Sequence, residues 1–218
     1  MNIILENTEA TFVEKKSKFI ASLIKVSDED DAIKNIENIK KKYYDARHNC
    51  YAYTVGLNKQ ISKSSDDGEP SGTAGRPMLS ILEGEKLTNT LVVVTRYFGG
   101  ILLGTGGLQK AYSTATKLAI EDIKNKNLLK EILKGFRFNI NTPYDKLGKI
   151  ENYFKNEDGI YILNKKFDES IDLDIVINVD KEDKIKSFFT ELFSKEVNID
   201  KKENIYYYIG EKNNLNVI

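Results

Sequence analysis

The sequence contains one cysteine, Cys50, one histidine, His48, and no tryptophan. A single cysteine excludes an intramolecular disulfide, and the two residues are too few for a zinc site made of cysteine and histidine. No run of about 18 apolar residues is present, so no membrane-spanning helix is predicted. The first residues lack the basic and long apolar stretches of a secretory signal peptide. These absences predict a protein of the reducing cytoplasm, with no metal, cofactor or membrane partner.

An excess of one charge sign is also missing, because 33 basic residues balance 33 acidic residues. Zero net charge argues against a protein that coats nucleic acid by bulk charge, although it leaves room for a local basic patch. The 218 residues, 40% hydrophobic and 30% charged, have the balance of a soluble globular protein with one large or two small domains.

The first half of the chain holds most of the unusual residues. Residues 1–125 contain ten of the 14 glycines, three of the four arginines, and both His48 and Cys50. Apolar patterning predicts a mixture of strands and helices there, which we assign to a domain of residues 1–125. The expected strands are Thr8–Val13, Phe19–Val26, Asn49–Val55 and Leu91–Thr95, and the expected helices run from the N-cap Ser27 to Tyr44, from Pro77 to Leu82, and from Gly107 to Ile123.

The second half alternates strands and helices in a regular order. The expected elements are a strand at Ile132–Ile140, a helix at Pro143–Phe154, strands at Ile160–Lys166 and Ile171–Val179, a helix at Lys181–Phe193 and a strand at Val197–Ile209. The order β-α-β-β-α-β is that of ferredoxin-like domains. We therefore predict an α+β chain with a small C-terminal domain of residues 130–210 and a boundary near residues 125–129.

Arginine is scarce, with four arginines against 29 lysines. Where only positive charge is needed, this chain uses lysine, so each arginine points to a need for its planar, bidentate guanidinium. Arg47, Arg76 and Arg96 lie in the densest polar segments. We expect them to hold carboxylates or phosphates in fixed geometry. The alternative is an internal salt bridge to Asp66, Asp67 or Glu69.

A polar loop follows from Ser64 to Pro77, with the sequence SSDDGEPSGTAGRP. Ser71 and Thr73 are candidate caps for the next helix. Asp66, Asp67 and Glu69 can serve as oxygen ligands or as a general base, or can pair with the arginines. The spacing matches no cation-binding loop, so no metal site is predicted.

A second polar segment, from Thr95 to Tyr112, is rich in glycine between an expected strand and an expected helix. Such a loop can present backbone N–H groups to an anion, or can simply allow tight packing. It lacks the lysine and hydroxyl pair of a P-loop, and it lacks the dinucleotide fingerprint. Tyr97 and Phe98 offer a stacking surface for RNA bases if they are exposed. The candidate anion-binding residues of this segment are Arg96, Tyr97, Gly99, Gly100, Gly104, Thr105, Gly106 and Gly107.

His48 is the one side chain with an ordinary pKa near neutrality, so it is a candidate general acid or base. Cys50 lies two residues away on the same face of the expected strand, which makes a Cys–His pair conceivable. A buried, inert cysteine is the favoured alternative.

Three segments, DARHNCYAYTVG from Asp45, SDDGEPSGTAGRPML from Ser65 and VVVTRYFGGILLGTGGLQKAY from Val92, together resemble the Impact family in its bacterial two-domain form. The resemblance covers about residues 8–122. It implies an N-terminal domain with the fold of ribosomal protein S5 domain 2, and a C-terminal ferredoxin-like domain similar to those of elongation factor G. It also implies a link to translational control, which eukaryotic relatives exert by competing for the activator of a kinase that phosphorylates an initiation factor. For bacterial members it implies binding to nucleic acid or ribosomes.

These observations predict a non-enzymatic, cytoplasmic binding or regulatory protein that is linked to translation through RNA or ribosome binding. Two alternatives stay open. One is a protein–protein adaptor in translational or stress regulation. The other is an enzyme that acts on a small phosphorylated or acidic substrate through His48 and the loop of Asp66, Asp67 and Glu69.

Overall fold

The computed structural model describes residues 1–57, 61–194, 203–210 and 214–218. The chain divides into two units, Met1–Glu131 and Ile132–Ile218, and both mix helices with strands. The first unit extends past residue 125, where the sequence analysis ended the first domain. The reason is that β7 (Leu129–Glu131) pairs with β1 (Asn2–Ile4) in a small antiparallel sheet. Within the described residues, no helix is long and apolar enough to cross a membrane.

The main sheet of the first unit has five antiparallel strands in the order β2-β3-β6-β4-β5. Their bounds are Thr8–Glu14 for β2, Ser17–Lys25 for β3, His48–Val55 for β4, Ile61–Ser65 for β5 and Thr90–Tyr97 for β6. The strand β6 lies in the centre and is buried on both faces. Val92 and Val94 face one apolar core, and Leu91 and Val93 face the other, which explains the unbroken apolar run in its sequence.

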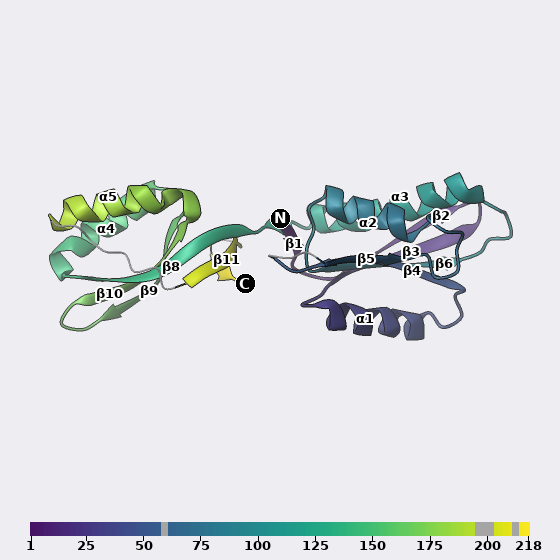
Figure 1. The fold of residues 1–218 in the computed structure, drawn as a ribbon, viewed down its shortest axis with the longest axis horizontal. Helices are drawn as coiled ribbons and strands as arrows, with labels where there is room; N and C mark the ends of the chain where they lie inside the picture. Colours follow the sequence, from purple (N-terminus) through teal and green to yellow (C-terminus); the bar gives the residue numbers. More distant parts are fainter. Residues whose placement is uncertain (58–60, 195–202, 211–213) are drawn as a thin grey trace. The chain divides into compact units, whose positions relative to one another are not determined.

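Helices cover both faces of this sheet (Figure 1). Helix α1 (Glu29–Lys42) packs on one face, and α2 (Gly75–Gly84) and α3 (Gly104–Asn125) pack side by side on the other. The larger core lies between the sheet and the pair α2 and α3. The candidate site residues are gathered at the ends of β4 and β6 and in the segments that lead into α2 and α3.

The second unit has a five-stranded antiparallel sheet in the order β12-β11-β8-β10-β9. Helices α4 and α5 pack on one face of it and enclose an apolar core (Figure 1). The element order from β8 to β11 is β-α-β-β-α-β, and a short strand follows. The bounds are Leu133–Thr142 for β8, Tyr144–Asn156 for α4, Ile160–Phe167 for β9, Ile171–Asn178 for β10, Val179–Lys181 for the 3-10 turn η1, Glu182–Phe193 for α5, Glu203–Ile209 for β11 and Leu215–Val217 for β12.

Some element ends differ from the sequence-based expectations. Helix α3 begins at Gly104 rather than Gly107, so three glycines lie in its first turn. Asp28, not Ser27, caps α1, because the Asp28 side chain accepts a hydrogen bond from the N–H of Asp31. Strand β5 was not expected, since its residues are mostly exposed and polar. Of the strand expected at Val197–Ile209, residues 197–202 lie outside the described part.

Candidate functional site

Asp66, in the loop after β5, closes the N-terminal end of helix α2. One carboxylate oxygen accepts hydrogen bonds from the backbone N–H groups of Ala74 and Gly75, at 2.9 and 2.8 Å. The other accepts the N–H of Gly72 at 2.8 Å. Because the first N–H groups of a helix have no acceptor within it, this carboxylate supplies the cap.

The expected caps, Ser71 and Thr73, are not used in this way. Thr73 donates its hydroxyl proton to the backbone oxygen of Pro70 at 2.6 Å, and Ser71 is exposed. Helix α2 has no cap from a side chain of its own N-cap residue, which is Ala74. The expectation was wrong because the cap comes from a residue eight positions earlier, which the local sequence pattern does not reveal.

Replacing Asp66 by asparagine tests this cap and its pH dependence. Partial burial raises the pKa of Asp66, but the three N–H bonds outweigh it and hold the pKa below the ordinary value of 3.8. A pKa lowered by folding stabilises the fold above the unfolded-state pKa, and this stabilisation is lost as pH falls through the folded-state pKa. We expect Asp66→Asn to lose about 1–2 kcal/mol of unfolding free energy at pH 7, because an amide nitrogen replaces one of the two accepting oxygens and the remaining hydrogen bonds lose the charge of the acceptor.

Urea titrations of both proteins at pH 7, 5 and 3 check this expectation. The difference in unfolding free energy between the two proteins should become smaller toward pH 3, because only the wild type has this carboxylate to protonate. A gap that stays constant across the three pH values would contradict the assignment of Asp66 as an ionised cap.

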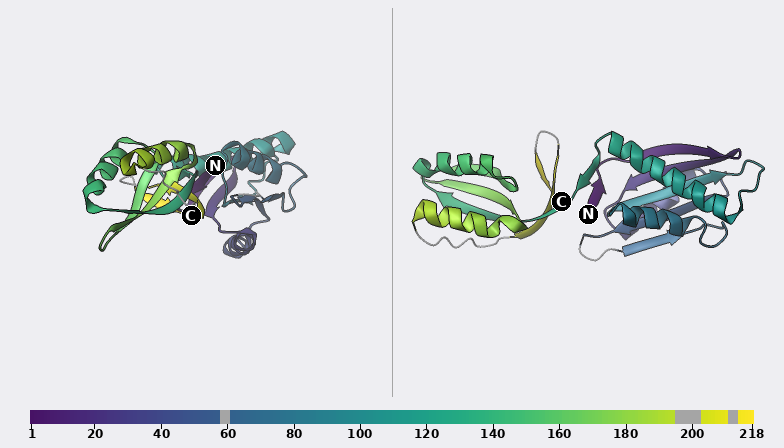
Figure 2. Two further views of the ribbon diagram at one scale, coloured as in Figure 1. Left: turned by 60° about the vertical axis from the view of Figure 1, so that its left-hand side comes forward. Right: turned by 90° about the horizontal axis from the view of Figure 1, so that it is seen from above.

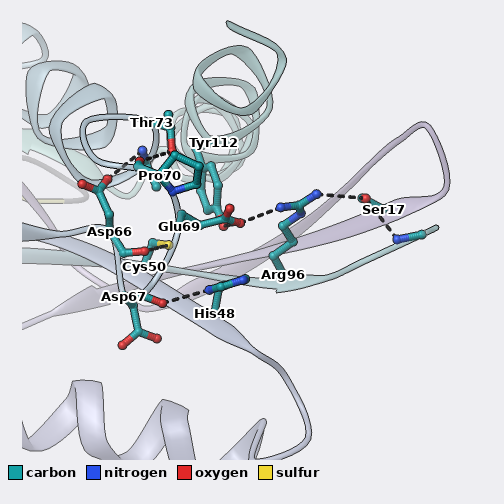
Figure 3. Close-up of polar contacts among 12 residues, drawn as sticks. Ser17, His48, Cys50, Asp66, Asp67, Glu69, Pro70, Thr73, Arg96 and Tyr112 are labelled. Carbon is teal, nitrogen blue, oxygen red and sulfur yellow. Dashed lines mark hydrogen bonds and ion pairs between the residues drawn. The ribbon is translucent and has the colours of Figure 1, made fainter. Parts of the chain in front are cut away.

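His48 and Asp67 fix the turn that precedes α2 against the start of β4. The Nδ1 of His48 lies 2.9 Å from the backbone oxygen of Asp67, so Nδ1 carries the proton and donates it. The Asp67 carboxylate accepts the backbone N–H of Asn49 at 2.7 Å and pairs with Lys40 at 2.7 Å. The histidine and the aspartate therefore hold the fold together here and do not converge on a common substrate position (Figure 3).

Glu69 and Arg96 form a buried ion pair. The distance from Arg96 Nη1 to Glu69 Oε1 is 2.7 Å, and the side chains are only 7% and 3% exposed. The same glutamate oxygen accepts the hydroxyl proton of Tyr112 at 2.7 Å, from the middle of α3. Burial raises the pKa of Tyr112, so this hydroxyl stays protonated. For Arg96, the internal salt bridge is therefore the alternative that the structure supports, and this arginine is not available to an outside ligand.

The guanidinium of Arg96 also approaches the strand β3. Its Nη2 lies 3.5 Å from the hydroxyl of Ser17, and the same hydroxyl accepts the backbone N–H of Gly99 at 3.1 Å. Figure 3 shows Arg96 between Glu69 and Ser17. The network joins β3, β6, the acidic loop and α3 at one end of the sheet.

Cys50 is buried on β4 and donates its Sγ–H to the backbone oxygen of Asp66 at 2.9 Å. Burial raises the pKa of this thiol to about 12, which keeps it protonated at neutral pH. Because the thiolate is the reactive form, this cysteine has a structural role, as the favoured interpretation held. Within the described residues, no group of three or more histidine, cysteine, aspartate or glutamate side chains is placed to hold a metal ion.

The glycine-rich segment combines close packing with an exposed helix start. Gly99 lies against the backbone of Lys16 and Ser17, so that a Cβ there would meet the Lys16 carbonyl carbon at 2.0 Å. Gly100 and Gly104 have φ values of +84° and +72°, which other residues rarely adopt. Thr105 and Gly106 are exposed at the start of α3, and Gly107 packs near the side chain of Leu103. Packing thus explains Gly99 and Gly107, and the segment from Gly104 to Gly106 stays open to a ligand.

Tyr97 and Phe98 differ in exposure. The Tyr97 hydroxyl donates to Asp45 at 2.7 Å and the residue is half-buried. Phe98 is 51% exposed. Of the two aromatic residues expected to form a stacking surface, Phe98 has the more accessible ring.

The two other candidate arginines are exposed. Arg47 lies just before β4 and Arg76 in the first turn of α2, and neither guanidinium forms an ion pair with another described residue. Arg76 lines a shallow groove of about 470 Å³ between the N-terminal halves of α2 and α3. Figure 2 shows these helices side by side. The residues that line the groove with polar or charged side chains are Arg76 and Ser80 from α2, and Gln109, Lys110 and Ser113 from α3.

The groove includes residues that the sequence analysis did not select, above all Lys110. A signal for it exists in the sequence. Residues 70–82 and 97–120 contain three basic residues, Arg76, Lys110 and Lys117, and no aspartate or glutamate, in a chain with 33 acidic residues. All three basic side chains are exposed. The groove itself is therefore lined by two basic side chains, Arg76 and Lys110, and by no acidic side chain of the described residues, on a protein of zero net charge.

Comparison with known proteins gives consistent results. Residues 15–120 match the model of the Impact N-terminal domain. The chain is 37% identical over 203 residues to the IMPACT family member YvyE of Bacillus subtilis (strain 168), covering 93% of this chain and 91% of the relative. It is 44% identical over 111 residues to the IMPACT family member YigZ of Escherichia coli (strain K12), covering 50% of this chain and 54% of that one.

A solved structure is similar over the same share of the chain as the first of these relatives. The crystal structure of a hypothetical protein superimposes with a TM-score of 0.55 at 30% sequence identity, covering 93% of this chain and 97% of that one. The family match includes the acidic loop, the Arg96 network and the basic groove. The chain belongs to the IMPACT family.

Proposed function

We propose that this protein is a non-enzymatic binding protein of the cytoplasm that acts in the regulation of translation by holding RNA, on its own or on the ribosome, in the groove between α2 and α3. The observation that supports this most directly is the lining of the groove, which contains the two basic side chains Arg76 and Lys110 and no carboxylate among the described residues. A cationic groove attracts phosphates, and because it has no acidic side chains, no negative charge within it repels an anionic backbone.

The chemistry of the groove suits a phosphodiester backbone. Arg76 brings a planar guanidinium that binds two phosphate oxygens at once, and Lys110 adds a point charge from the facing helix. The hydroxyls of Ser80 and Ser113 are further donors to phosphate oxygens. Because the groove is shallow and open, it fits an extended chain better than an enclosed small molecule.

An enzymatic role through His48 and the acidic loop has less support. Asp66 caps a helix, Asp67 is bound to Lys40 and the backbone, and Glu69 is buried against Arg96 and Tyr112. A general base needs a free lone pair within reach of a substrate proton. Each of the three carboxylates instead makes contacts that hold the fold together.

Membership of the IMPACT family supports the link to translation. We also propose the finer fold assignments: an S5 domain 2-like fold for the first unit and a ferredoxin-like fold for the second. The second rests on the order β-α-β-β-α-β and on the strand order β11-β8-β10-β9. With the strands numbered along the unit, this is the order 4-1-3-2.

Co-sedimentation with purified ribosomes at low and moderate salt tests the proposal. The wild type is compared with the double variant Arg76→Ala/Lys110→Ala. A matched control, Lys34→Ala/Lys41→Ala, removes two exposed charges from α1 on the opposite face of the sheet. We expect the wild type and the control to pellet at low salt, and the groove variant to lose most of its binding, because phosphate contacts dominate such affinity. Equal pelleting of all three proteins, or pelleting that salt does not change, would overturn the groove assignment.

A further inference from the structure

We propose that the segment Phe98–Leu102, called here the apolar loop, stacks against unpaired bases, so that the protein prefers single-stranded RNA to duplex RNA. The inference rests on the proposed function, because it assigns to the same RNA a second point of contact next to the groove. It names the class of RNA that the first unit recognises.

The apolar loop exposes large apolar side chains and contains no charged residue. Phe98 is 51% exposed, Ile101 is 43% exposed and Leu102 is 83% exposed. From Tyr97 to Gln109 the sequence contains no charged residue. Burial in the core explains none of these three side chains, and exposed apolar clusters of this kind mark binding surfaces.

The ring of Phe98 is held in place by a buried support. The guanidinium carbon of Arg96 lies 5.6 Å from the ring centroid. Arg96 is in turn fixed by its ion pair with Glu69. One face of the ring therefore lies against a cation that is itself held by an ion pair, and about half of the residue is exposed to a ligand. A fixed aromatic platform loses little conformational entropy when a base stacks on it.

The apolar loop and the basic groove are close along the chain. Leu102 lies four residues before Gly106, which lines the groove. An extended chain spans at most about 3.5 Å per residue, so these two positions are no more than about 14 Å apart. A single strand of two or three nucleotides covers that span. The apolar loop and the groove therefore adjoin, and one short single strand that contacts both is consistent with this spacing.

The two surfaces together favour an unpaired strand over a duplex. A duplex presents phosphates and sugar hydroxyls but keeps its base faces stacked inside, so it would leave Phe98 and Leu102 without a partner. An unpaired base offers a flat apolar face to the ring. The nearby hairpin adds Lys15, Lys16 and Lys18, and the pocket between that hairpin and α3 is lined by Lys15 and Lys110 together with one acidic residue, Glu14, which leaves an excess of positive charge. This positive surrounding complements the charge of a nucleic acid.

Fluorescence anisotropy of the full chain with labelled RNA tests the inference. The probes are a single strand of about 12 nucleotides and the same strand annealed to its complement, a length within the usual site size of single-strand binders. The variants are Phe98→Ala, Phe98→Leu and Phe98→Tyr. Ile33→Ala, which removes an exposed apolar side chain from α1, is the matched control. Circular dichroism establishes that each variant is folded.

We expect wild type and Ile33→Ala to bind the single strand about tenfold more tightly than the duplex, and Phe98→Ala and Phe98→Leu to lose that preference. Phe98→Tyr should retain it, because a tyrosine ring stacks as a phenylalanine ring does. If both RNAs bind with equal affinity and the Phe98 variants bind as the wild type does, the apolar loop has another partner, such as a protein, and the inference is wrong while the proposed function stands. If the wild type binds neither RNA, the proposed function fails together with it.

Discussion

Replacing Glu69 by alanine is expected to lower the free energy of unfolding of the first unit by about 3–5 kcal/mol, the cost of leaving a buried charge without its partner. The Arg96 guanidinium is only 7% exposed, so water cannot replace the lost carboxylate. Tyr112 loses the acceptor of its hydroxyl proton in the same step. Urea titration of the full chain, followed by circular dichroism, measures the effect.

An exposed ion pair on the same unit provides the control. Lys124 pairs with Glu85 at 2.6 Å, with side chains that are 42% and 36% exposed. Glu85→Ala should cost no more than about 1 kcal/mol, as surface pairs usually do. The double variant Glu69→Met/Arg96→Met should recover part of the loss, since it removes both buried charges. Equal effects of Glu69→Ala and Glu85→Ala would contradict the assignment of the buried pair as the link between the acidic loop and β6.

Replacing Gly99 by alanine is expected to destabilise the first unit by about 3 kcal/mol or more, since overpacking against rigid atoms is costly. The new Cβ would lie 2.0 Å from the carbonyl carbon of Lys16, and the atoms that it meets are backbone atoms. To relieve this clash, either the β2–β3 hairpin or the end of β6 has to shift. The Gly99 hydrogen bond to Ser17 would be lost with that shift.

Gly106 provides the matched control from the same segment. A Cβ there meets no atom within 4 Å, and the residue lies in the first turn of α3. Gly106→Ala should therefore raise stability by about 0.5–1 kcal/mol, because alanine restricts the unfolded chain and favours the helix. Thermal unfolding of the two variants measures both effects. A neutral Gly99→Ala would show that the backbones do not approach as closely as described.

The two glycine variants also separate packing from ligand binding. Gly106 lines the groove and is exposed, whereas Gly99 is held against β3. The sequence pattern treats them alike, as members of one glycine-rich segment. Only the atoms that surround each glycine in the structure show which of the two is required for packing.

The secondary structure was predictable where periodicity is strong. The apolar run of β6 and the helical spacing in α1 are visible in the sequence. The start of α3 was missed because glycines have low helix propensity and no side chain to mark a face. Strand β5 was missed because Ile61–Ser65 is mostly exposed at the edge of the sheet and shows no apolar alternation.

The roles of the acidic residues could not be predicted from the sequence. Glu69 meets Arg96 across 27 positions and Tyr112 across 43 positions, so the contact depends on how β6 and α3 cross. The sequence allows each acidic residue to be a ligand, a base or a partner of an arginine. Tertiary structure pairs Glu69 with Arg96, pairs Asp67 with Lys40 rather than with an arginine, and makes Asp66 a cap. The acidic loop, which is the densest polar segment, therefore makes contacts within the protein. The groove beside it includes residues that no sequence motif singled out, such as Lys110.

The salt dependence of RNA binding is the measurement that tests the central claim most directly. Affinity for a short single-stranded RNA is measured over a range of salt concentrations for the wild type, for Arg76→Ala/Lys110→Ala and for Lys34→Ala/Lys41→Ala. The groove account predicts that the logarithm of affinity falls linearly with the logarithm of salt, and that the slope is smaller by about 1.4 for the groove variant, because each phosphate contact with a single strand contributes about 0.7. The α1 control should keep the wild-type slope. Identical slopes for all three proteins would contradict the account.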